Sequence, residues 1–120
     1  MTGEELVLRA EAAATHAYAP YSNYLVGASV LITDGRVFDG VNVENAAYPL
    51  GVCAEKTAIG NAASAGVRPG EIEAIGITAS PCGGCRQWLS EFRLDRATYV
   101  HEGELVTRTV TELLPDTWDL

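Results

Sequence analysis

Apolar and polar residues recur with two different periods along the chain, and these periods predict a series of helices and strands. The opening Thr2-Gly3-Glu4-Glu5 has the form of a capping box, and apolar residues at helical spacing follow it, which predicts a helix over residues 3–17. Segments 26–33 and 36–41 are rich in branched apolar residues and flank Asp34-Gly35, a strong signal for a two-residue hairpin connection. A helix followed by an antiparallel pair of strands is therefore expected.

Helices and strands also alternate through the rest of the chain. The alanine-rich segment 53–65, closed by Gly66, predicts a helix, and the continuous apolar run 72–79 predicts a strand buried on both faces. Four further elements are expected: a helix at 83–92, strands at 95–101 and 104–107, and a helical turn at 109–114. This order predicts an α/β fold in which a mixed five-stranded sheet is sandwiched between helices. The length of 120 residues suits a single domain over residues 1–120.

Composition and charge narrow the classes of function. The net charge of −8, from 16 acidic and 8 basic residues, would repel a phosphate backbone, so no nucleic-acid partner is expected. No apolar run approaches the length of a membrane span, and the first residues show no secretory signal. Together with three cysteines, an odd number that argues against a disulfide framework, this predicts a cytoplasmic protein with a small, uncharged substrate and no membrane partner.

The three cysteines predict a catalytic zinc site. Cys82 and Cys85 are two residues apart with glycines between them, a spacing that brings two sulfurs onto one ion, and Cys53 would be the third ligand. Three protein ligands leave one tetrahedral position open, which is typical of catalytic rather than structural zinc. Because three thiolates outweigh the two charges of the ion, the helix starts at the cysteines and Lys56, three residues after Cys53, are expected to offset the surplus negative charge.

Glu55 is the carboxylate closest in sequence to a ligand, and it is expected to carry the proton between an activated water and the substrate. In the middle of a helix, residues two apart diverge by about 200°. Both Cys53 and Glu55 can therefore face one ion only if Cys53 occupies the non-helical cap. Under that condition the site predicts hydrolytic deamination.

Two other classes of protein share parts of this pattern. A structural zinc module would need a fourth ligand, and neither His16 nor His101 has ligand spacing to the cysteines. A dithiol redox protein could be built on Cys82 and Cys85 alone, but Cys53 followed by Glu55 favours a metal. A metal analysis separates the three classes.

Asn42 and Glu44 project from the same side if the segment 42–45 is extended, and two such polar groups could bind the hydroxyls of a sugar. Periodicity alone favours an ordinary edge strand with its polar face in water.

The sequence closely resembles the small homotetrameric zinc-dependent cytidine deaminases over nearly its whole length. The motifs that carry the resemblance are Pro20-Tyr21-Ser22-Asn23-Tyr24, Val26-Gly27-Ala28, Gly40-Val41-Asn42-Val43-Glu44-Asn45, Cys53-Ala54-Glu55, Ser80-Pro81-Cys82-Gly83-Gly84-Cys85-Arg86-Gln87 and Leu113-Leu114-Pro115. The pair of cysteine motifs also matches the signature of zinc deaminases that act on nucleobases. The resemblance implies one Zn²⁺ per chain and hydrolysis of the nucleosides cytidine and 2'-deoxycytidine to uridine and 2'-deoxyuridine, with release of ammonia.

The resemblance also implies roles for individual residues. Cys53, Cys82 and Cys85 would bind zinc, and Glu55 would pass the proton first to N3 of the ring and then to the leaving amine. The resemblance assigns Asn42 and Glu44 to the ribose, in place of the edge-strand interpretation, and the Ala54 backbone to the pyrimidine. It implies a homotetramer in which Tyr48 and Trp118 serve the site of a neighbouring subunit.

Three positions depart from the family pattern. Lys56 stands where arginine is usual, which predicts a differently tuned metal site, because an ammonium is a point charge rather than a planar fork. Tyr24 replaces a common phenylalanine near the base, and residues 79–81 lack a loop that many members carry, so substrate breadth is affected. A deaminase of the antibiotic blasticidin S is the alternative. A polynucleotide deaminase is disfavoured by the charge.

Overall fold

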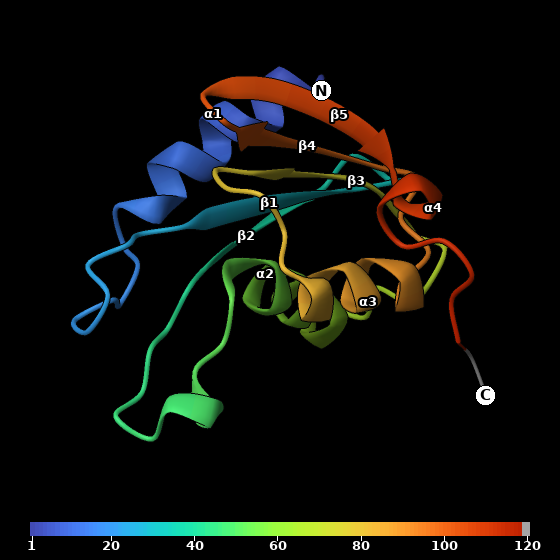
Figure 1. Cartoon of the computed structure of the whole chain (residues 1–120). Helices are drawn as coiled ribbons and strands as arrows, with labels where there is room; N and C mark the ends of the chain where they lie inside the picture. The colour runs from blue at the N-terminus through green and yellow to red at the C-terminus, as the bar shows by residue number, and fades with distance from the viewer. Residues whose placement is uncertain (119–120) are drawn as a thin grey trace.

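The computed structural model describes residues 1–118 and is organised around one five-stranded sheet in the order β2-β1-β3-β4-β5 (Figure 1). The strand pairs β1–β2, β1–β3 and β4–β5 are antiparallel and β3–β4 is parallel, so the sheet is mixed. The strands are β1 (Gly27–Ile32), β2 (Val37–Val41), β3 (Ile72–Ile77), β4 (Arg96–His101) and β5 (Glu104–Thr109). The predicted five-stranded mixed sheet is confirmed.

Helices cover both faces of the sheet, which confirms the predicted sandwich. Helix α1 (Gly3–Ala14) lies on one face, and α2 (Ala54–Ser64) and α3 (Gly83–Glu91) lie on the other (Figure 1). A short helix α4 (Val110–Leu113) follows β5, and a 3₁₀ turn η1 (Tyr48–Leu50) lies in a projecting loop. Within residues 1–118, no helix has both the length and the apolar character needed to span a bilayer.

Two local predictions differ from the structure. Helix α1 starts at the predicted capping box of Thr2 and Glu5 but ends at Ala14 rather than residue 17. The chain leaves the helix there because the Tyr18 N–H donates to the Asn42 carbonyl (3.0 Å), a pairing that extended backbone makes. The hairpin is confirmed, but its connection spans three residues, since the Ile32 N–H bonds the Arg36 carbonyl and Gly35 takes a positive φ of 97°.

The register of the sheet brings the ends of several elements to one edge. Gly27 pairs with Val41 and Ala28 pairs with Ile77, so the carboxyl ends of β2 and β3 lie on either side of the start of β1. The segments that continue from those ends carry the polar residue Asn42 and the loop before Cys82. Residues that are far apart in sequence therefore meet at this edge.

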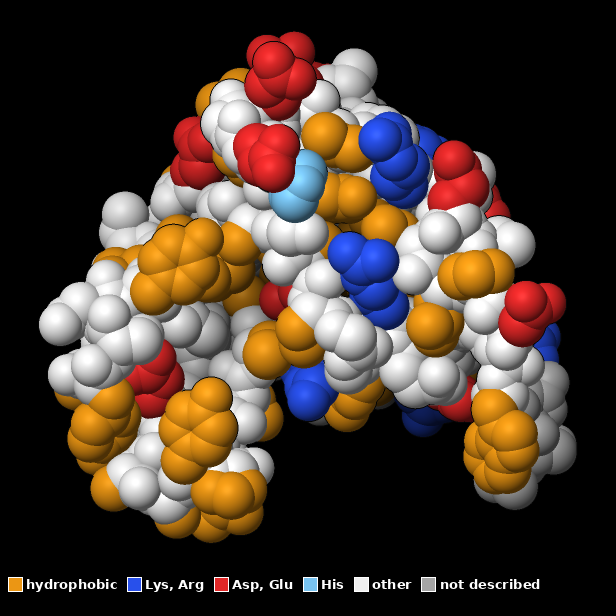
Figure 2. Space-filling model, viewed as in Figure 1, with side chains coloured by type: hydrophobic (Ala, Val, Ile, Leu, Met, Phe, Trp, Pro, Cys, Tyr) orange, Lys and Arg blue, Asp and Glu red, His pale blue; other side chains and the backbone are white. Residues whose placement is uncertain are grey.

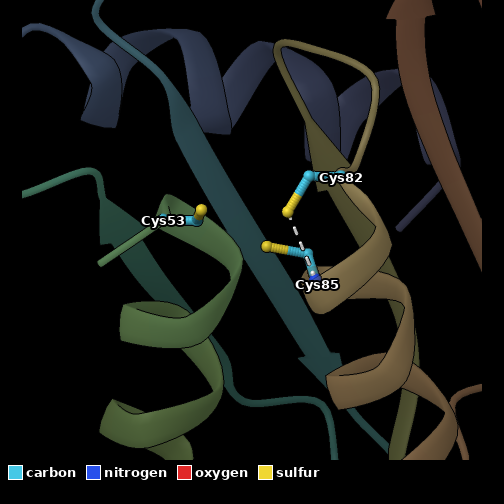
Figure 3. Close-up of side chains that lie close together, drawn as sticks. All are labelled: Cys53, Cys82 and Cys85. Carbon is cyan, nitrogen blue, oxygen red and sulfur yellow. Dashed lines mark hydrogen bonds between the residues drawn. The ribbon is translucent and has the colours of Figure 1, made fainter. Parts of the chain in front are cut away.

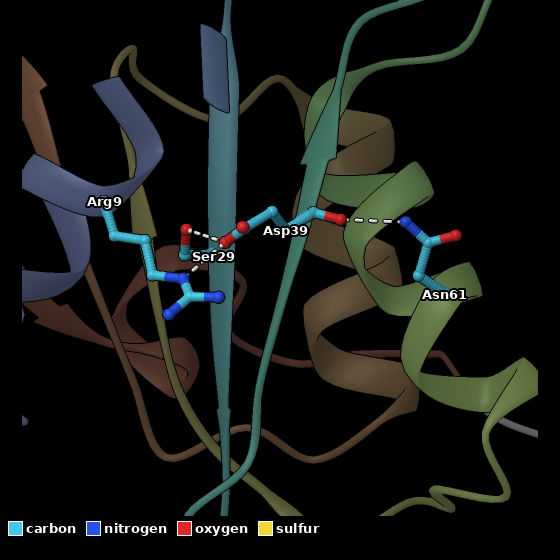
Figure 4. A network of polar contacts seen from close by, with 4 residues as sticks. All are labelled: Arg9, Ser29, Asp39 and Asn61. Atoms are coloured by element: carbon cyan, nitrogen blue, oxygen red, sulfur yellow. Dashed lines mark hydrogen bonds and ion pairs between the residues drawn. The ribbon is translucent and has the colours of Figure 1, made fainter. Parts of the chain in front are cut away.

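A polar network ties the layers together beside this edge (Figure 4). The Arg9 guanidinium of α1 and the Ser29 hydroxyl of β1 both donate to one carboxylate oxygen of Asp39 on β2, at 2.8 and 2.7 Å. The Asn61 amide of α2 donates to the Asp39 carbonyl at 2.8 Å. One residue of β2 is thus bonded to a helix on each face of the sheet, which fixes α2 relative to the strands.

Candidate active site

The three cysteine sulfurs lie within 4.8 Å of one another at the starts of α2 and α3 (Figure 3). Cys53 is the N-cap of α2 and Cys82 the N-cap of α3, while Cys85 is buried in the first turn of α3. An ion about 2.3 Å from each sulfur in tetrahedral geometry requires sulfurs about 3.8 Å apart, so the cluster needs to close by at most about 1 Å. The cluster fits a zinc site.

The N-cap position of Cys53 satisfies the geometric condition set by the sequence. Its backbone is extended, with φ −79° and ψ 158°, so it does not follow the helical rotation that would turn it away from Glu55. Glu55 is only 4% exposed, and the neighbouring Cys85 thiol acts to lower its pKa. A buried carboxyl group therefore lies directly beside the sulfurs.

Burial and hydrogen bonding shift the pKa values of the three thiols. Burial raises the pKa of the Cys53 and Cys85 thiols above the ordinary value. Burial also acts to raise the pKa of Cys82, but hydrogen bonds from the Cys85 N–H and from the neighbouring thiols outweigh it and lower that pKa. Cys82 is thus the thiol most ready to ionise.

Burial also raises the pKa of Glu55, with its own backbone N–H, the Cys85 thiol and the Lys56 ammonium acting in the opposite direction. A carboxyl group with a raised pKa gains and loses a proton closer to neutral pH, as a proton carrier requires. Lys56 lies on the Cys82 side of the cluster. A side chain added at Gly84 would meet both the Lys56 Nζ (3.8 Å) and the Cys82 sulfur (3.9 Å).

A cavity of about 520 Å³ opens along the segment that leads from β2 toward Cys53, and its lining ends at Val52 without including a cysteine or Glu55. Its lining includes five residues of the segments discussed so far and the residue that precedes the first cysteine: Tyr21, Ser22, Asn42, Glu44, Tyr48 and Val52. The predicted polar pair therefore lines one hollow together with the predicted subunit-contact residue Tyr48.

The polar pair is bound to the loop before β1. The Asn42 amide oxygen accepts from the Val26 N–H (2.9 Å), and its NH₂ group donates to the Tyr24 carbonyl (2.8 Å). Glu44 accepts from the backbone N–H groups of Tyr21 (3.0 Å) and Ser22 (3.1 Å) and from the Ser22 hydroxyl. These bonds keep the Glu44 carboxyl ionised, because they lower its pKa, the Ser22 hydroxyl most strongly.

A backbone bridge sets the distance between the polar pair and the cysteines. Val43, between Asn42 and Glu44, exchanges two hydrogen bonds with Val52, at 3.0 and 2.9 Å. Val52 directly precedes Cys53. The Val43–Val52 bridge therefore brings Asn42 and Glu44 close to Cys53, although about ten residues separate them in the chain.

The remaining predicted residues have different environments. Ala54 is fully buried at the start of α2, where helical N–H groups lack intrahelical partners. Tyr24 is 62% exposed, Tyr48 91% and Trp118 75%. The structure thus brings Ala54 to the cluster and leaves these three aromatic side chains largely in solvent.

Ser22 and Arg86 are contacts of the site that reasoning from the residues overlooked. Serine at position 22 is typical of a turn, and no periodic pattern in the sequence predicts its hydrogen bond to Glu44. Arg86 donates to the Pro81 carbonyl (3.0 Å) and the Leu113 carbonyl (3.2 Å), linking the cysteine loop to the end of α4. Only its place in a cysteine motif could have marked it.

Comparison with known proteins agrees with this geometry. A family model described as the cytidine and deoxycytidylate deaminase zinc-binding region matches residues 1–101. The chain is 40% identical to a cytidine deaminase of Sporosarcina psychrophila, over 96% of this chain and 90% of the relative. It is 41% identical to one of Halalkalibacterium halodurans, over 96% of this chain and 92% of the relative.

Solved structures give the same result. The crystal structure of cytidine deaminase from Burkholderia pseudomallei superposes with a TM-score of 0.89 at 43% identity, covering 98% of this chain and all of that one. The crystal structure of cytidine deaminase from Mycobacterium tuberculosis superposes with a TM-score of 0.85 at 36% identity, covering 100% of this chain and 99% of that one. The fold and the three-cysteine centre define a zinc-dependent deaminase. The chain belongs to the cytidine deaminase family.

Proposed function

We propose that the protein converts cytidine and 2'-deoxycytidine to uridine and 2'-deoxyuridine by hydrolysis. The observation that carries the proposal is the buried carboxyl of Glu55 beside three convergent sulfurs, one backbone bridge away from a polar pair suited to a sugar. The relatives reported above are named for cytidine, which gives the blasticidin S alternative no support.

Zinc, when held by the three cysteines, would supply Lewis-acid activation of water at neutral pH. Glu55 takes a proton from the attacking water and donates it to N3 of the pyrimidine. The bond between the water oxygen and C4 forms in this first step. Glu55 then takes the remaining proton from that oxygen and delivers it to the exocyclic amine, as the carbon–nitrogen bond breaks and the C4 carbonyl forms. Cytidine and water thus give uridine and ammonia, with no other reactant.

Asn42 and Glu44 would position the sugar. After its contacts with the loop, the Asn42 amide retains one N–H, and Glu44 retains acceptor capacity on the oxygen that the Ser22 hydroxyl reaches. A donor and an acceptor side by side match a hydroxyl group, which both accepts and donates. The Ala54 backbone and the Tyr24 side chain would contact the base.

Lys56 would offset the surplus negative charge of the three thiolates, helped by the amino ends of α2 and α3. As the only lysine in the chain, it offers a clean test of this role. Reduced thiols are the form that a zinc site needs, which suits a cytoplasmic location, and the net charge of −8 disfavours a polynucleotide substrate.

The proposed assembly is a homotetramer. Large apolar side chains are exposed on two projecting loops, residues 18–25 and 43–52, at the lower left of Figures 1 and 2. A contiguous exposed apolar surface is typical of an interface. In the tetramer, Tyr48 and Trp118 would reach the site of a neighbouring subunit and cover the open cavity.

A substrate panel tests the activity. The wild type is expected to lower the absorbance of cytidine and 2'-deoxycytidine solutions and to leave blasticidin S and single-stranded DNA unchanged. Glu55→Gln should lose about 10³-fold in turnover while retaining one zinc per chain. Glu91→Gln, the same change at an exposed site of α3, is the control. Conversion of blasticidin S without conversion of cytidine would contradict the proposal.

Subunit complementation tests the shared site. Glu55→Gln and Tyr48→Ala chains are unfolded together, refolded as a mixture and assayed against each variant refolded alone. If each site draws on two chains, mixed assemblies contain some intact sites and recover activity. Activity equal to the average of the two separate preparations would mean that each chain works alone.

A further inference from the structure

The Ser22 side chain connects the carboxylate of Glu44 to the loop before β1. Its hydroxyl donates to one Glu44 oxygen, and its backbone N–H donates to the other at 3.1 Å. The same hydroxyl oxygen accepts from the Tyr24 N–H at 3.0 Å. The hydroxyl therefore has one direction left for its proton, and that direction is toward the carboxylate.

Glu44 depends on this loop for its orientation. Within the described residues, the groups that donate to its carboxylate belong to Tyr21 and Ser22, and it forms no ion pair. The two backbone N–H groups fix one oxygen. Within residues 1–118, the Ser22 hydroxyl alone bonds the other oxygen, which therefore keeps free acceptor capacity, and Glu44 lines the cavity.

We propose that Ser22 is a positioning residue for substrate selection, which acts by fixing the Glu44 carboxylate oxygen that accepts from the sugar. This inference rests on the proposed function of Glu44. Ser22 touches the carboxylate rather than the reacting atoms, so its effect should depend on the sugar and be absent from the chemistry at the base. The ligand class is a pyrimidine nucleoside whose sugar retains a ring hydroxyl.

The experiment compares Ser22→Ala, Ser22→Thr and Glu44→Gln with the wild type on cytidine and on 2',3'-dideoxycytidine, which lacks both ring hydroxyls. Ser22→Ala should lower kcat/KM for cytidine about tenfold, mainly through KM, because a hydrogen bond to a charged group is lost. On 2',3'-dideoxycytidine the change should be less than twofold. Ser22→Thr, which keeps the hydroxyl, should restore activity on cytidine to near the wild-type value.

Controls separate this effect from general damage. Ser64→Ala removes an exposed hydroxyl at the end of α2 and should leave kcat/KM unchanged for both substrates. Melting temperature and zinc content are measured for every variant. An equal loss on both substrates, or no loss on cytidine, overturns the role of Ser22.

The two levels of inference fail in different ways. If Glu44→Gln is impaired equally on both substrates, the sugar contact of Glu44 is wrong, and the role of Ser22 fails with it. If Glu44→Gln shows a loss confined to cytidine while Ser22→Ala does not, the proposed function stands and the inference about Ser22 alone is wrong. If the wild type converts neither nucleoside, the proposed activity itself fails.

Discussion

Replacing Gly40 by alanine should displace the helix that carries two active-site residues. Gly40 lies on β2 where α2 crosses it. An added methyl group would sit 2.2 Å from the Ala58 nitrogen, 2.5 Å from the Ala54 carbonyl oxygen and 2.5 Å from the Thr57 hydroxyl. Two of these atoms are backbone and cannot rotate away. Since non-bonded atoms prefer about 3.5 Å or more, α2 would have to move outward by about 1 Å.

The magnitudes follow from this displacement. Overpacking against backbone costs about 3 kcal/mol, the upper part of the usual range, which lowers Tm by about 10 °C for a chain of this size. The movement also shifts Cys53 and Glu55 away from Cys82 and Cys85, which α3 holds. A misplacement of about 1 Å is expected to reduce kcat/KM about 100-fold.

The assay combines thermal unfolding followed by circular dichroism with cytidine turnover, measured well below the Tm of the variant. Gly60→Ala is the matched control, because it adds a methyl group to α2 itself at a point where no heavy atom beyond its own stretch of helix lies within 4 Å. That change should stabilise the helix by about 0.5–1 kcal/mol and leave activity unchanged. A Gly40→Ala protein with wild-type Tm and turnover would refute the close packing of α2 on β2.

Three further predictions concern charge and protons. Lys56→Gln should lose zinc to a chelator at least several-fold faster than Lys56→Arg. Equal rates would show that the charge at position 56 does not help to hold the metal. Because burial raises the pKa of the Cys53 and Cys85 thiols, they are protonated at neutral pH, so zinc binding should release protons and tighten as pH rises. Calorimetry in two buffers of different ionisation heat measures that release, and identical heats would contradict it. The pKa of Glu112 lies below its ordinary 4.5 because of the Thr109 backbone N–H and hydroxyl, so its stabilising effect is complete above about pH 4.5 and is lost as the pH falls. Glu112→Gln should show a shallower loss of stability with acid than the wild type, and an unchanged slope would exclude the capping contact.

The sequence predicted those features that depend on neighbouring residues. The capping box at Thr2 marks where α1 begins, since it needs a hydroxyl and a carboxylate three residues apart. Cys82 and Cys85 could be paired from their spacing alone. The end of α1 at Ala14 could not be predicted from neighbouring residues. It is set by a backbone bond between Tyr18 and Asn42, which no local pattern reveals.

The part of the candidate site that holds Asn42 and Glu44, the proposed sugar-binding pair, was harder to predict from the sequence for the same physical reason. Alternation at Asn42 and Glu44 gives their common side but not their partners. Apart from the Ser22 hydroxyl, those partners are backbone groups of a loop about twenty residues earlier, and a backbone N–H has no sequence signature. Resemblance assigned the pair to ribose, whereas periodicity favoured a solvated edge. The structure adds that both side chains are already bonded to the protein.

The position of Cys53 at a helix cap links the two halves of the site. An extended residue there allows Val52 to pair with Val43 and lets the next residues begin α2 at once. If Cys53 lay one turn inside the helix, Val52 would be helical and could not form the bridge that fixes Asn42 and Glu44. The side chains of Cys53 and Glu55, two residues apart within a helix, would then point in nearly opposite directions. One backbone conformation at one residue therefore determines both how close Asn42 and Glu44 lie to the cysteines and how Glu55 faces them.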